Sequence, residues 1–171
     1  AGIPSPVTLR VITRFSTLAG IESPMTPDVT VVVCTRDRPR ELERCLAALA
    51  AQRDSHFEVL VVDNGTADGI ADLCRTRGAT WIREPHPGLT RARNLGARAA
   101  RGEIVAYIDD DAIAEPGWLG ALVRPFADPR IAAVAGHTRY MKSRGDTLEM
   151  TGEDAPHEGR RRAPLVVDRT T

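Results

Sequence analysis

The sequence predicts an α/β fold in which a mostly parallel sheet carries helices on both faces. Three observations support this prediction. Apolar, β-branched runs of the kind found in fully covered strands recur along the chain. Each run except the last is followed by a segment with helical apolar spacing. Strands and helices that alternate in this way are joined by crossovers, and crossovers connect parallel strands.

The elements follow in order from residue 29. The first strand, "VTVVVC" (29–34), is a continuous β-branched run. The next segment, "RPRELERCLAALAAQ", has Leu42, Cys45, Leu46 and Leu49 at i, i+3, i+4 and i+7, which is one apolar helical face. The later predicted elements are strand 57–63, helix 67–78, strand 79–84, helix 90–102 with Thr90 as N-cap, strand 103–109, helix 117–127 and strand 131–140.

These elements place one core domain at residues 28–140. Residues 1–27 hold four of the twelve prolines and read as an arm or linker, in which 7–13 is an edge strand. Residues 141–171 are a polar and charged segment, and we predict no regular structure for residues 142–164 within it. The chain starts without methionine and ends abruptly, so we expect a piece of a longer protein whose missing half follows residue 171.

Composition excludes several classes of function. The 171 residues have zero formal net charge and 4% aromatic residues, which argues against nucleic-acid binding. No apolar stretch is long enough to span a bilayer, and the start does not resemble a signal peptide. Three cysteines, an odd number, fit buried apolar positions in a reducing compartment. We therefore expect a cytoplasmic protein, or one held at the cytoplasmic face of a membrane by its missing part.

Polar residues gather where the predicted strands end. The first strand runs into Thr35, Arg36, Asp37 and Arg38, and the second ends at Asp63 and Asn64. Ligands of open parallel sheets bind at the carboxyl ends of the strands, so these side chains are candidates for one site. Charge is also uneven: residues 75–101 hold seven arginines and one glutamate, which suits phosphate binding next to the acidic strand end that follows.

That acidic strand end is the run Asp109, Asp110 and Asp111. Side chains alternate along an extended chain, so we expect Asp109 and Asp111 on one side and Asp110 on the other. Two carboxylates with oxygen-only chemistry suit Mg²⁺ or Mn²⁺, whose coordination shell is completed by water and substrate phosphates. The alternative is a solvated acidic turn before the next helix.

Two further candidates also allow a structural interpretation. Arg93 lies in the first turn of a predicted helix, where it can clamp a phosphate or hold one of the aspartates, or simply be exposed. Asp63 opens the turn "NGT"; its carboxylate can accept from a nucleobase or ribose, or cap the turn. The Thr35 hydroxyl is likewise either a donor to a nucleotide or an ordinary strand end.

The stretches "VTVVVCTRDRPRELERCLAAL", "FEVLVVDNGTADG" and "PGLTRARNLGARAARGEIVAYIDDDA", in this order, resemble family 2 glycosyltransferases of the GT-A fold. The resemblance covers about residues 29–140 and implies a Rossmann-like half that binds a nucleotide-diphosphate sugar. It also implies metal-assisted transfer of the sugar, with inversion, to an acceptor hydroxyl. The donor-binding residues implied are Thr35, Arg36, Asp37, Asp63, Arg93, Asp109 and Asp110, and the metal ligands are Asp111 and Asp109 within the Asp-x-Asp signature.

The family's catalytic base comes from a segment well beyond the Asp-x-Asp signature, and here the match is poor. Glu153 and Asp154, in "GED", resemble a fragment of that later motif but arrive early. One alternative is therefore a nucleotide-sugar-binding domain that performs no transfer. A nucleotidyltransferase would carry a glycine-rich loop after its first strand, and "CTRDRPREL" has no glycine. An aspartate-based phosphatase would carry its Asp-x-Asp after the first strand, not the fourth.

Overall fold

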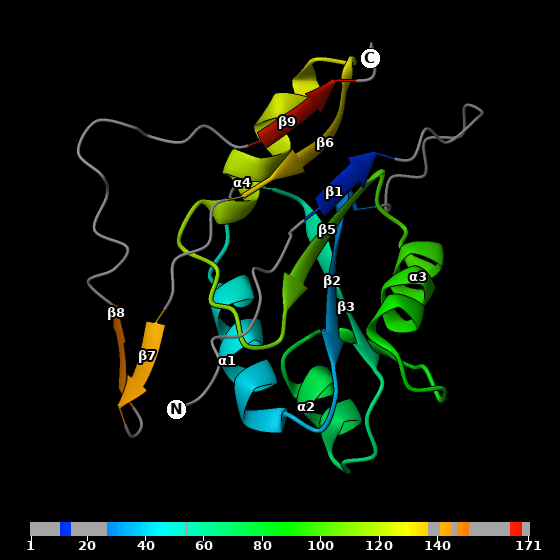
Figure 1. Cartoon of the computed structure of the whole chain (residues 1–171), viewed down its shortest axis with the longest axis vertical. Coiled ribbons are helices and arrows are strands. Elements are labelled where there is room, and N and C mark those ends of the chain that lie inside the picture. The colour runs from blue at the N-terminus through cyan, green and yellow to red at the C-terminus, as the bar shows by residue number, and fades with distance from the viewer. Residues whose placement is uncertain are drawn as a thin grey trace.

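The computed structural model describes residues 11–14, 27–53, 55–136, 141–144, 147–150 and 165–168. Seven strands form one sheet in the order β4-β3-β2-β5-β1-β6-β9 (Figure 1). The elements are β1 (Val11–Arg14), β2 (Val29–Thr35), α1 (Pro39–Ala50), β3 (Phe57–Asp63), α2 (Ile70–Thr76), β4 (Thr80–Arg83), α3 (Leu89–Ala99), β5 (Ile104–Asp109), α4 (Trp118–Val123), the 3₁₀ helix η1 (Arg124–Ala127), β6 (Ile131–Ala135) and β9 (Leu165–Asp168). A separate two-stranded ribbon pairs β7 (Met141–Arg144) with β8 (Thr147–Met150).

The strands β4, β3, β2 and β5 form a parallel block, which confirms the predicted α/β fold. In its register, Thr35 of β2 lies opposite Asp63 of β3, and Cys34 lies opposite Asp109 of β5. The carboxyl ends of three strands therefore meet at one edge of the sheet. The polar residues that follow these strands are brought to that edge by backbone pairing alone.

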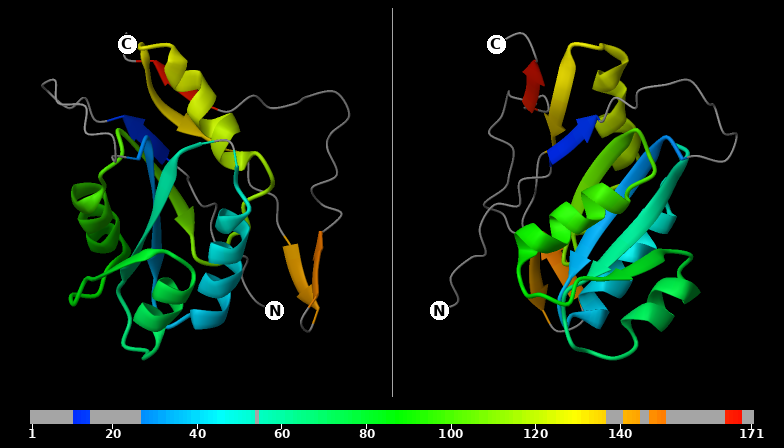
Figure 2. Two further views of the ribbon diagram at one scale, coloured as in Figure 1. Left: turned by 180° about the vertical axis from the view of Figure 1, so that it is seen from behind. Right: turned by 90° about the vertical axis from the view of Figure 1, so that its right-hand side faces the viewer.

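Helices cover both faces of this block, as Figure 2 shows. Alternate residues of β2 point to opposite faces. Val31 and Val33 belong to the core beneath α1, α2 and α4, whereas Val32 packs with Ala92 of α3 on the other face. The continuous β-branched run of β2 is thus explained by burial on both sides. The apolar stripe predicted for α1 is the buried face of that helix.

Two glycines allow the α3 segment to lie close to the sheet. A Cβ at Gly96 would overlap the Val32 side chain, so the helix can approach β2 only because that position has no side chain. A Cβ at Gly102 would lie 2.5 Å from the backbone nitrogen of Thr30. The Gly102 N–H instead donates to the Thr30 hydroxyl at 2.8 Å. This close packing fixes where α3 begins, next to the carboxyl ends of the strands.

The strands outside the parallel block differ from expectation. β1 is not an edge strand: it lies inside the sheet, antiparallel to both β5 and β6. Residues 142–164, for which we predicted no regular structure, include most of β7 and all of β8, and β9, which follows them, pairs antiparallel with β6. Antiparallel pairing between distant segments leaves little periodic signal in four-residue strands, so the sequence did not predict it. In the described residues no helix is long and apolar enough to cross a membrane.

Candidate functional site

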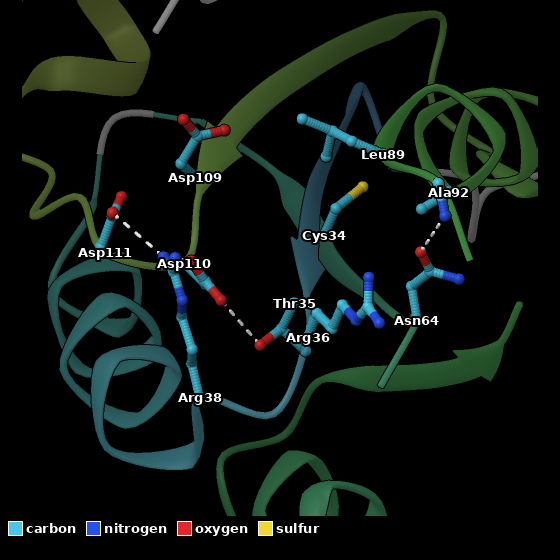
Figure 3. A pocket seen from close by; sticks show the side chains of 11 residues that line it. Cys34, Thr35, Arg36, Arg38, Asn64, Leu89, Ala92, Asp109, Asp110 and Asp111 are labelled. Atoms are coloured by element: carbon cyan, nitrogen blue, oxygen red, sulfur yellow. Dashed lines mark hydrogen bonds and ion pairs between the residues drawn. The ribbon is translucent and has the colours of Figure 1, made fainter. Parts of the chain in front are cut away.

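A cavity of about 320 Å³ opens at the carboxyl ends of β2 and β5, beside the start of α3 (Figure 3). Its walls come from four separate segments of the chain. The lining residues are Cys34, Thr35, Arg36, Arg38, Asn64, Gly88, Leu89, Ala92, Asp109, Asp110 and Asp111. A cavity of this size and position is typical of a small-molecule site in an open α/β sheet.

One side of the cavity, the acidic wall, consists of the three aspartates and Arg38. The Thr35 hydroxyl donates to Asp110 Oδ2 at 2.8 Å, and Arg38 Nη1 lies 3.5 Å from Asp110 Oδ1 and 3.3 Å from Asp111 Oδ2. Asp110 is buried, and burial raises the pKa of its carboxyl against the opposing hydrogen bond from Thr35. A cation at this wall therefore stabilises the ionised form of a carboxylate that burial disfavours.

Asp109 faces a different partner. Its Oδ1 lies 3.1 Å from Arg93 Nη2, while the Arg93 carbonyl accepts from the Tyr107 hydroxyl at 3.1 Å. We expected Asp109 and Asp111 on one side and Asp110 on the other, and this stays a prediction; Asp110 is buried, whereas the side chains of Asp109 and Asp111 are 27% and 50% exposed. β5 ends at Asp109, and the Ala112 N–H closes a turn onto the Asp109 carbonyl at 3.1 Å. Beyond the end of the strand, Arg38 contacts both Asp110 and Asp111.

The opposite side, the amide wall, is built around Asn64. Asn64 Nδ2 donates to the carbonyls of Glu84 and His86, each at 2.8 Å, and Asn64 Oδ1 accepts from the Gly88 N–H at 2.8 Å. One side chain thus satisfies three backbone groups of the loop that leads into α3. Gly88 has φ +145°, a conformation that favours glycine, and it is the residue before the helix. Thr90 is therefore not the N-cap that the sequence predicted.

The floor between these walls includes Cys34. Burial raises the pKa of its thiol to about 12. The thiol is accordingly neutral and weakly nucleophilic at physiological pH. Leu89 is half exposed at 52% and, with Ala92, gives the amide side an apolar surface. Figure 3 shows the Arg36 guanidinium directed toward Asn64, so a cation also faces the amide side.

Asp63 lies behind the cavity lining and is held by the protein. Its Oδ1 accepts from the Gly65 N–H at 3.0 Å, and its Oδ2 lies 3.0 Å from Arg83 Nη1 and 3.4 Å from Trp81 Nε1. The Asp63 side chain is 2% exposed. These contacts join the end of β3 to the edge strand β4.

Asp37 connects the loops that follow β2 and β3. Its Oδ1 accepts from the backbone N–H groups of Thr66 and Ala67, the latter at 2.7 Å, and these bonds lower the pKa of the Asp37 carboxyl. Asp37 itself has φ +57°, and a Cβ at Gly65 would lie 2.5 Å from Asp37 Oδ1. The left-handed backbone and the missing side chain at Gly65 together permit this clamp.

The structure thus divides the predicted residues into groups. Thr35, Arg36, Asp109, Asp110 and Asp111 line one cavity. Asp37, Asp63 and Arg93 surround it as supports, and their donor-binding roles stay predictions. Glu153 and Asp154 lie outside the described residues. The sequence placed Arg38 and Asn64 among the polar strand-end residues, but it assigned neither of them a role.

Within the described part of the chain, no three His, Cys, Asp or Glu side chains converge on a common point as a metal centre would require. The acidic wall is therefore not a cage that surrounds an ion with protein ligands. Its oxygen-only set is compatible with the Mg²⁺ or Mn²⁺ mode in which one or two carboxylates contribute and other ligands complete the shell.

The fold and the position of the cavity define an α/β domain of the GT-A-like class. A family model described as Glycosyl transferase family 2 matches residues 30–165. The chain therefore belongs to glycosyl transferase family 2. This confirms the resemblance drawn from the sequence, and the matched region includes every residue of the two walls.

Individual relatives agree with this assignment. Glycosyltransferase AglE of Haloferax volcanii is 29% identical over 129 residues, which are 71% of this chain and 42% of AglE. The pre-mycofactocin glycosyltransferase of Mycobacterium tuberculosis is 35% identical over 115 residues, which are 63% of this chain and 23% of the relative. This chain therefore spans less than half the length of these curated relatives.

Solved structures show the same relationship. Mannosyltransferase PcManGT from Pyrobaculum calidifontis, in complex with GDP-Man and Mn²⁺, is similar with a TM-score of 0.56 at 31% identity. The similarity covers 62% of this chain and 34% of PcManGT. S. aureus TarS 1-349 in complex with UDP-GlcNAc gives a TM-score of 0.50 at 26% identity, over 60% of this chain and 32% of TarS.

Proposed function

We propose that the cavity binds a nucleotide-diphosphate sugar and that the chain is the donor-binding part of a glycosyltransferase. One observation carries this proposal: a single cavity combines three carboxylates on one wall with Arg36 and an apolar helix start on the other. A nucleotide-diphosphate sugar needs both environments. Its diphosphate requires cations near the acidic wall, and its nucleoside requires a less polar surface with hydrogen-bonding groups.

The acidic wall fits Mg²⁺ or Mn²⁺. Arg38 Nη1 already lies between one oxygen of Asp110 and one of Asp111, so this pair of carboxylates attracts a cation. We propose Asp111 as the principal ligand, since its side chain is half exposed, and Asp109 as the second. A divalent cation bound there supplies positive charge for the departing nucleoside diphosphate.

The remaining side chains have binding and positioning roles in this proposal. Thr35 fixes Asp110 through its hydroxyl, and Arg93 fixes Asp109. The Arg36 side chain is 64% exposed, and among the described residues its one ion-pair contact is with Asp37 at 4.0 Å, so it is available to a ligand at the amide side. Asn64 holds the loop that brings Leu89 and Ala92 to the cavity. The similar structures of PcManGT with GDP-Man and Mn²⁺ and of TarS with UDP-GlcNAc support a donor of this class.

The proposed reaction is transfer to an acceptor hydroxyl with inversion. The hydroxyl oxygen forms a bond to the anomeric carbon while the bond to the diphosphate oxygen breaks, and the diphosphate leaves with the electron pair. The hydroxyl proton passes to a general base, for which Glu153 and Asp154 are the candidates in this chain. The second candidate function is donor binding without transfer. It is favoured by the short span of this chain relative to its curated relatives.

A thermal-shift panel tests donor binding with this chain as it stands. UDP, GDP, CDP and dTDP are each added with and without Mn²⁺. A ligand at about 100 times its Kd stabilises the fold by roughly 2.7 kcal/mol, a shift that is easily measured. We expect a Mn²⁺-dependent shift with one nucleotide. A chain that melts cooperatively and is shifted by none of the four would contradict the proposal.

The Asp111→Asn variant tests the metal ligand. We expect its Mn²⁺-dependent nucleotide shift to disappear while its melting temperature without ligand stays close to that of the wild type. Asp72→Asn is the matched control, because Asp72 is an exposed aspartate on α2 that pairs with Arg75 and does not line the cavity. Unchanged Mn²⁺-dependent affinity in Asp111→Asn would show that this residue is not a metal ligand.

A further inference from the structure

Arg38 is the residue of the cavity whose contacts the proposed function does not yet explain. A single nitrogen, Nη1, faces both Asp110 and Asp111, at 3.5 and 3.3 Å. Charge-assisted hydrogen bonds between guanidinium and carboxylate groups are normally about 2.7–2.9 Å long. Arg38 is therefore attracted to both carboxylates without making a tight bond to either.

Other arginine pairs near the cavity are closer. Arg83 lies 3.0 Å from Asp63, and Arg93 lies 3.1 Å from Asp109. The Arg38 side chain is also more exposed, at 54% against 40% for Arg83 and 35% for Arg93. A loose, exposed ion pair contributes little to stability. The contact of Arg38 with the acidic wall can therefore be exchanged at small cost.

The backbone that carries Arg38 is fixed, although its side chain is not. Arg38 immediately precedes α1, and its carbonyl accepts from the Leu42 N–H at 3.0 Å. On its other side, Asp37 is clamped to the Thr66 and Ala67 N–H groups. Movement of the guanidinium thus requires only rotation of the side chain, within the cavity that Arg38 lines.

The acidic wall needs a counter-charge at all times. Asp110 is buried, with 6% of the residue exposed, and an unpaired buried carboxylate is strongly unfavourable. Arg38 supplies that charge in the structure described here, at the place where the proposed function requires a divalent cation. The Arg38 guanidinium and a divalent cation cannot both approach the Asp111 carboxylate closely, so binding of one displaces the other from Asp111.

We propose that Arg38 is the resident cation of the acidic wall and changes partner during donor binding. It neutralises Asp110 and Asp111 until Asp111 becomes a ligand of a divalent cation, and the Arg38 guanidinium then binds the diphosphate of the donor. This inference rests on the proposed function, because it assumes that a divalent cation and a nucleoside diphosphate meet in this cavity. Arg38 is then a positioning residue before binding and a donor-binding residue after it.

Two affinities measured on the same variant test the exchange. Binding of Mn²⁺ alone is followed from the electron paramagnetic resonance signal of the free ion, and binding of UDP and GDP in saturating Mn²⁺ is followed by calorimetry. In Arg38→Ala, removal of the competing cation should tighten Mn²⁺ binding about fivefold. The same change should weaken nucleotide binding roughly tenfold, because a charge-assisted bond to the diphosphate is lost.

The opposite signs distinguish this role from a merely structural one. If Arg38 only held the carboxylates in place, Arg38→Ala would weaken Mn²⁺ binding, which would overturn the proposal. Tighter Mn²⁺ binding with unchanged nucleotide affinity would overturn the part of the proposal in which Arg38 binds the diphosphate. Arg38→Lys keeps the positive charge but not the planar guanidinium. We therefore expect its Mn²⁺ affinity to be near that of the wild type and its loss of nucleotide affinity to be smaller than that of Arg38→Ala.

Arg77→Ala is the matched control, since Arg77 forms an exposed pair with Glu43 and does not line the cavity. Both affinities should be unchanged in it. Measurements on the wild type distinguish a failure of the proposed function from a failure of the role assigned to Arg38. Absence of any Mn²⁺-dependent nucleotide binding in the wild type overturns the proposed function. Normal binding in the wild type, without opposite changes in Arg38→Ala, overturns only the role of Arg38.

Discussion

The two walls of the cavity hold their polar side chains in different ways. On the amide wall, each of the three hydrogen bonds of the Asn64 side chain is 2.8 Å long, and the partners are all backbone groups. Asp63, behind that wall, makes contacts of 3.0 Å with Gly65 and Arg83. On the acidic wall, by contrast, Arg38 lies 3.3–3.5 Å from its two carboxylates.

The difference distinguishes polar groups that are occupied by internal hydrogen bonds from polar groups that can exchange partners. Short bonds to backbone atoms fix the loops after β3 and β4, and they leave Asn64 and Asp63 little capacity for a ligand. Long contacts between exposed side chains leave Asp111 and Arg38 able to change partners. The amide wall is therefore a rigid support, and the acidic wall is the part of the site that responds to ligands. Substitutions on the two walls should accordingly affect different quantities.

The largest expected effect on stability is that of Asp63→Ala. The substitution leaves the Gly65 N–H without its acceptor and Arg83 without its partner, in a side chain only 2% exposed. We expect the free energy of unfolding to fall by about 3 kcal/mol, measured by urea denaturation. Asp72→Ala, which breaks an exposed pair with Arg75, is the control and should cost under about 0.5 kcal/mol. Equal losses in the two variants would show that Asp63 is not a structural residue.

A smaller effect is expected from Asn64→Asp, which keeps the shape of the side chain. The carboxylate cannot donate to the Glu84 and His86 carbonyls, and it places negative charge against both. We expect a loss of roughly 2 kcal/mol in unfolding free energy. Hydrogen exchange should speed up in residues 84–92 in particular. Exchange that accelerates equally over the whole sheet would contradict a local anchoring role.

Much of the fold followed from the sequence because its signals are local. The β-branched run of β2 and the apolar stripe of α1 each report burial directly, and parallel pairing then brings the strand ends together. Thr35, Arg36 and the three aspartates were predicted to share a site for this reason, and they do line one cavity. The position of β1 depends on antiparallel pairing with strands about 90 residues away, which no local pattern records.

The side-chain contacts were harder to predict because they join residues that are distant in sequence. Asp110 and Asp111 follow the last residue of β5, and both lie near Arg38, 72 and 73 residues earlier in the chain. The roles of Asn64 and Asp37 depend on which backbone groups lie nearby in space. Those partners are about 20 to 30 residues away in sequence. Only the folded geometry identifies such contacts.

The smallest expected effect is a pH dependence of opposite sign for the two kinds of aspartate. Backbone hydrogen bonds lower the pKa of Asp37 from 3.8 in the folded state. Its carboxylate therefore stabilises the fold above that pH, and the contribution is lost as the pH falls through the lowered pKa. Burial raises the pKa of Asp110 above 3.8. Its carboxylate therefore destabilises the fold above the raised pKa, and this penalty is absent below 3.8.

Denaturation of Asp37→Asn and Asp110→Asn across a pH series tests these signs. Near neutral pH, we expect Asp37→Asn to be less stable than the wild type and Asp110→Asn to be more stable. Both differences should shrink as the pH falls, since protonation makes the wild-type carboxyls neutral like the amides that replace them. Two variants that change stability in the same direction at neutral pH would contradict the contrast between Asp37 and Asp110. Asp110 would then be held by Thr35 and Arg38 as firmly as Asp37 is held by its backbone partners.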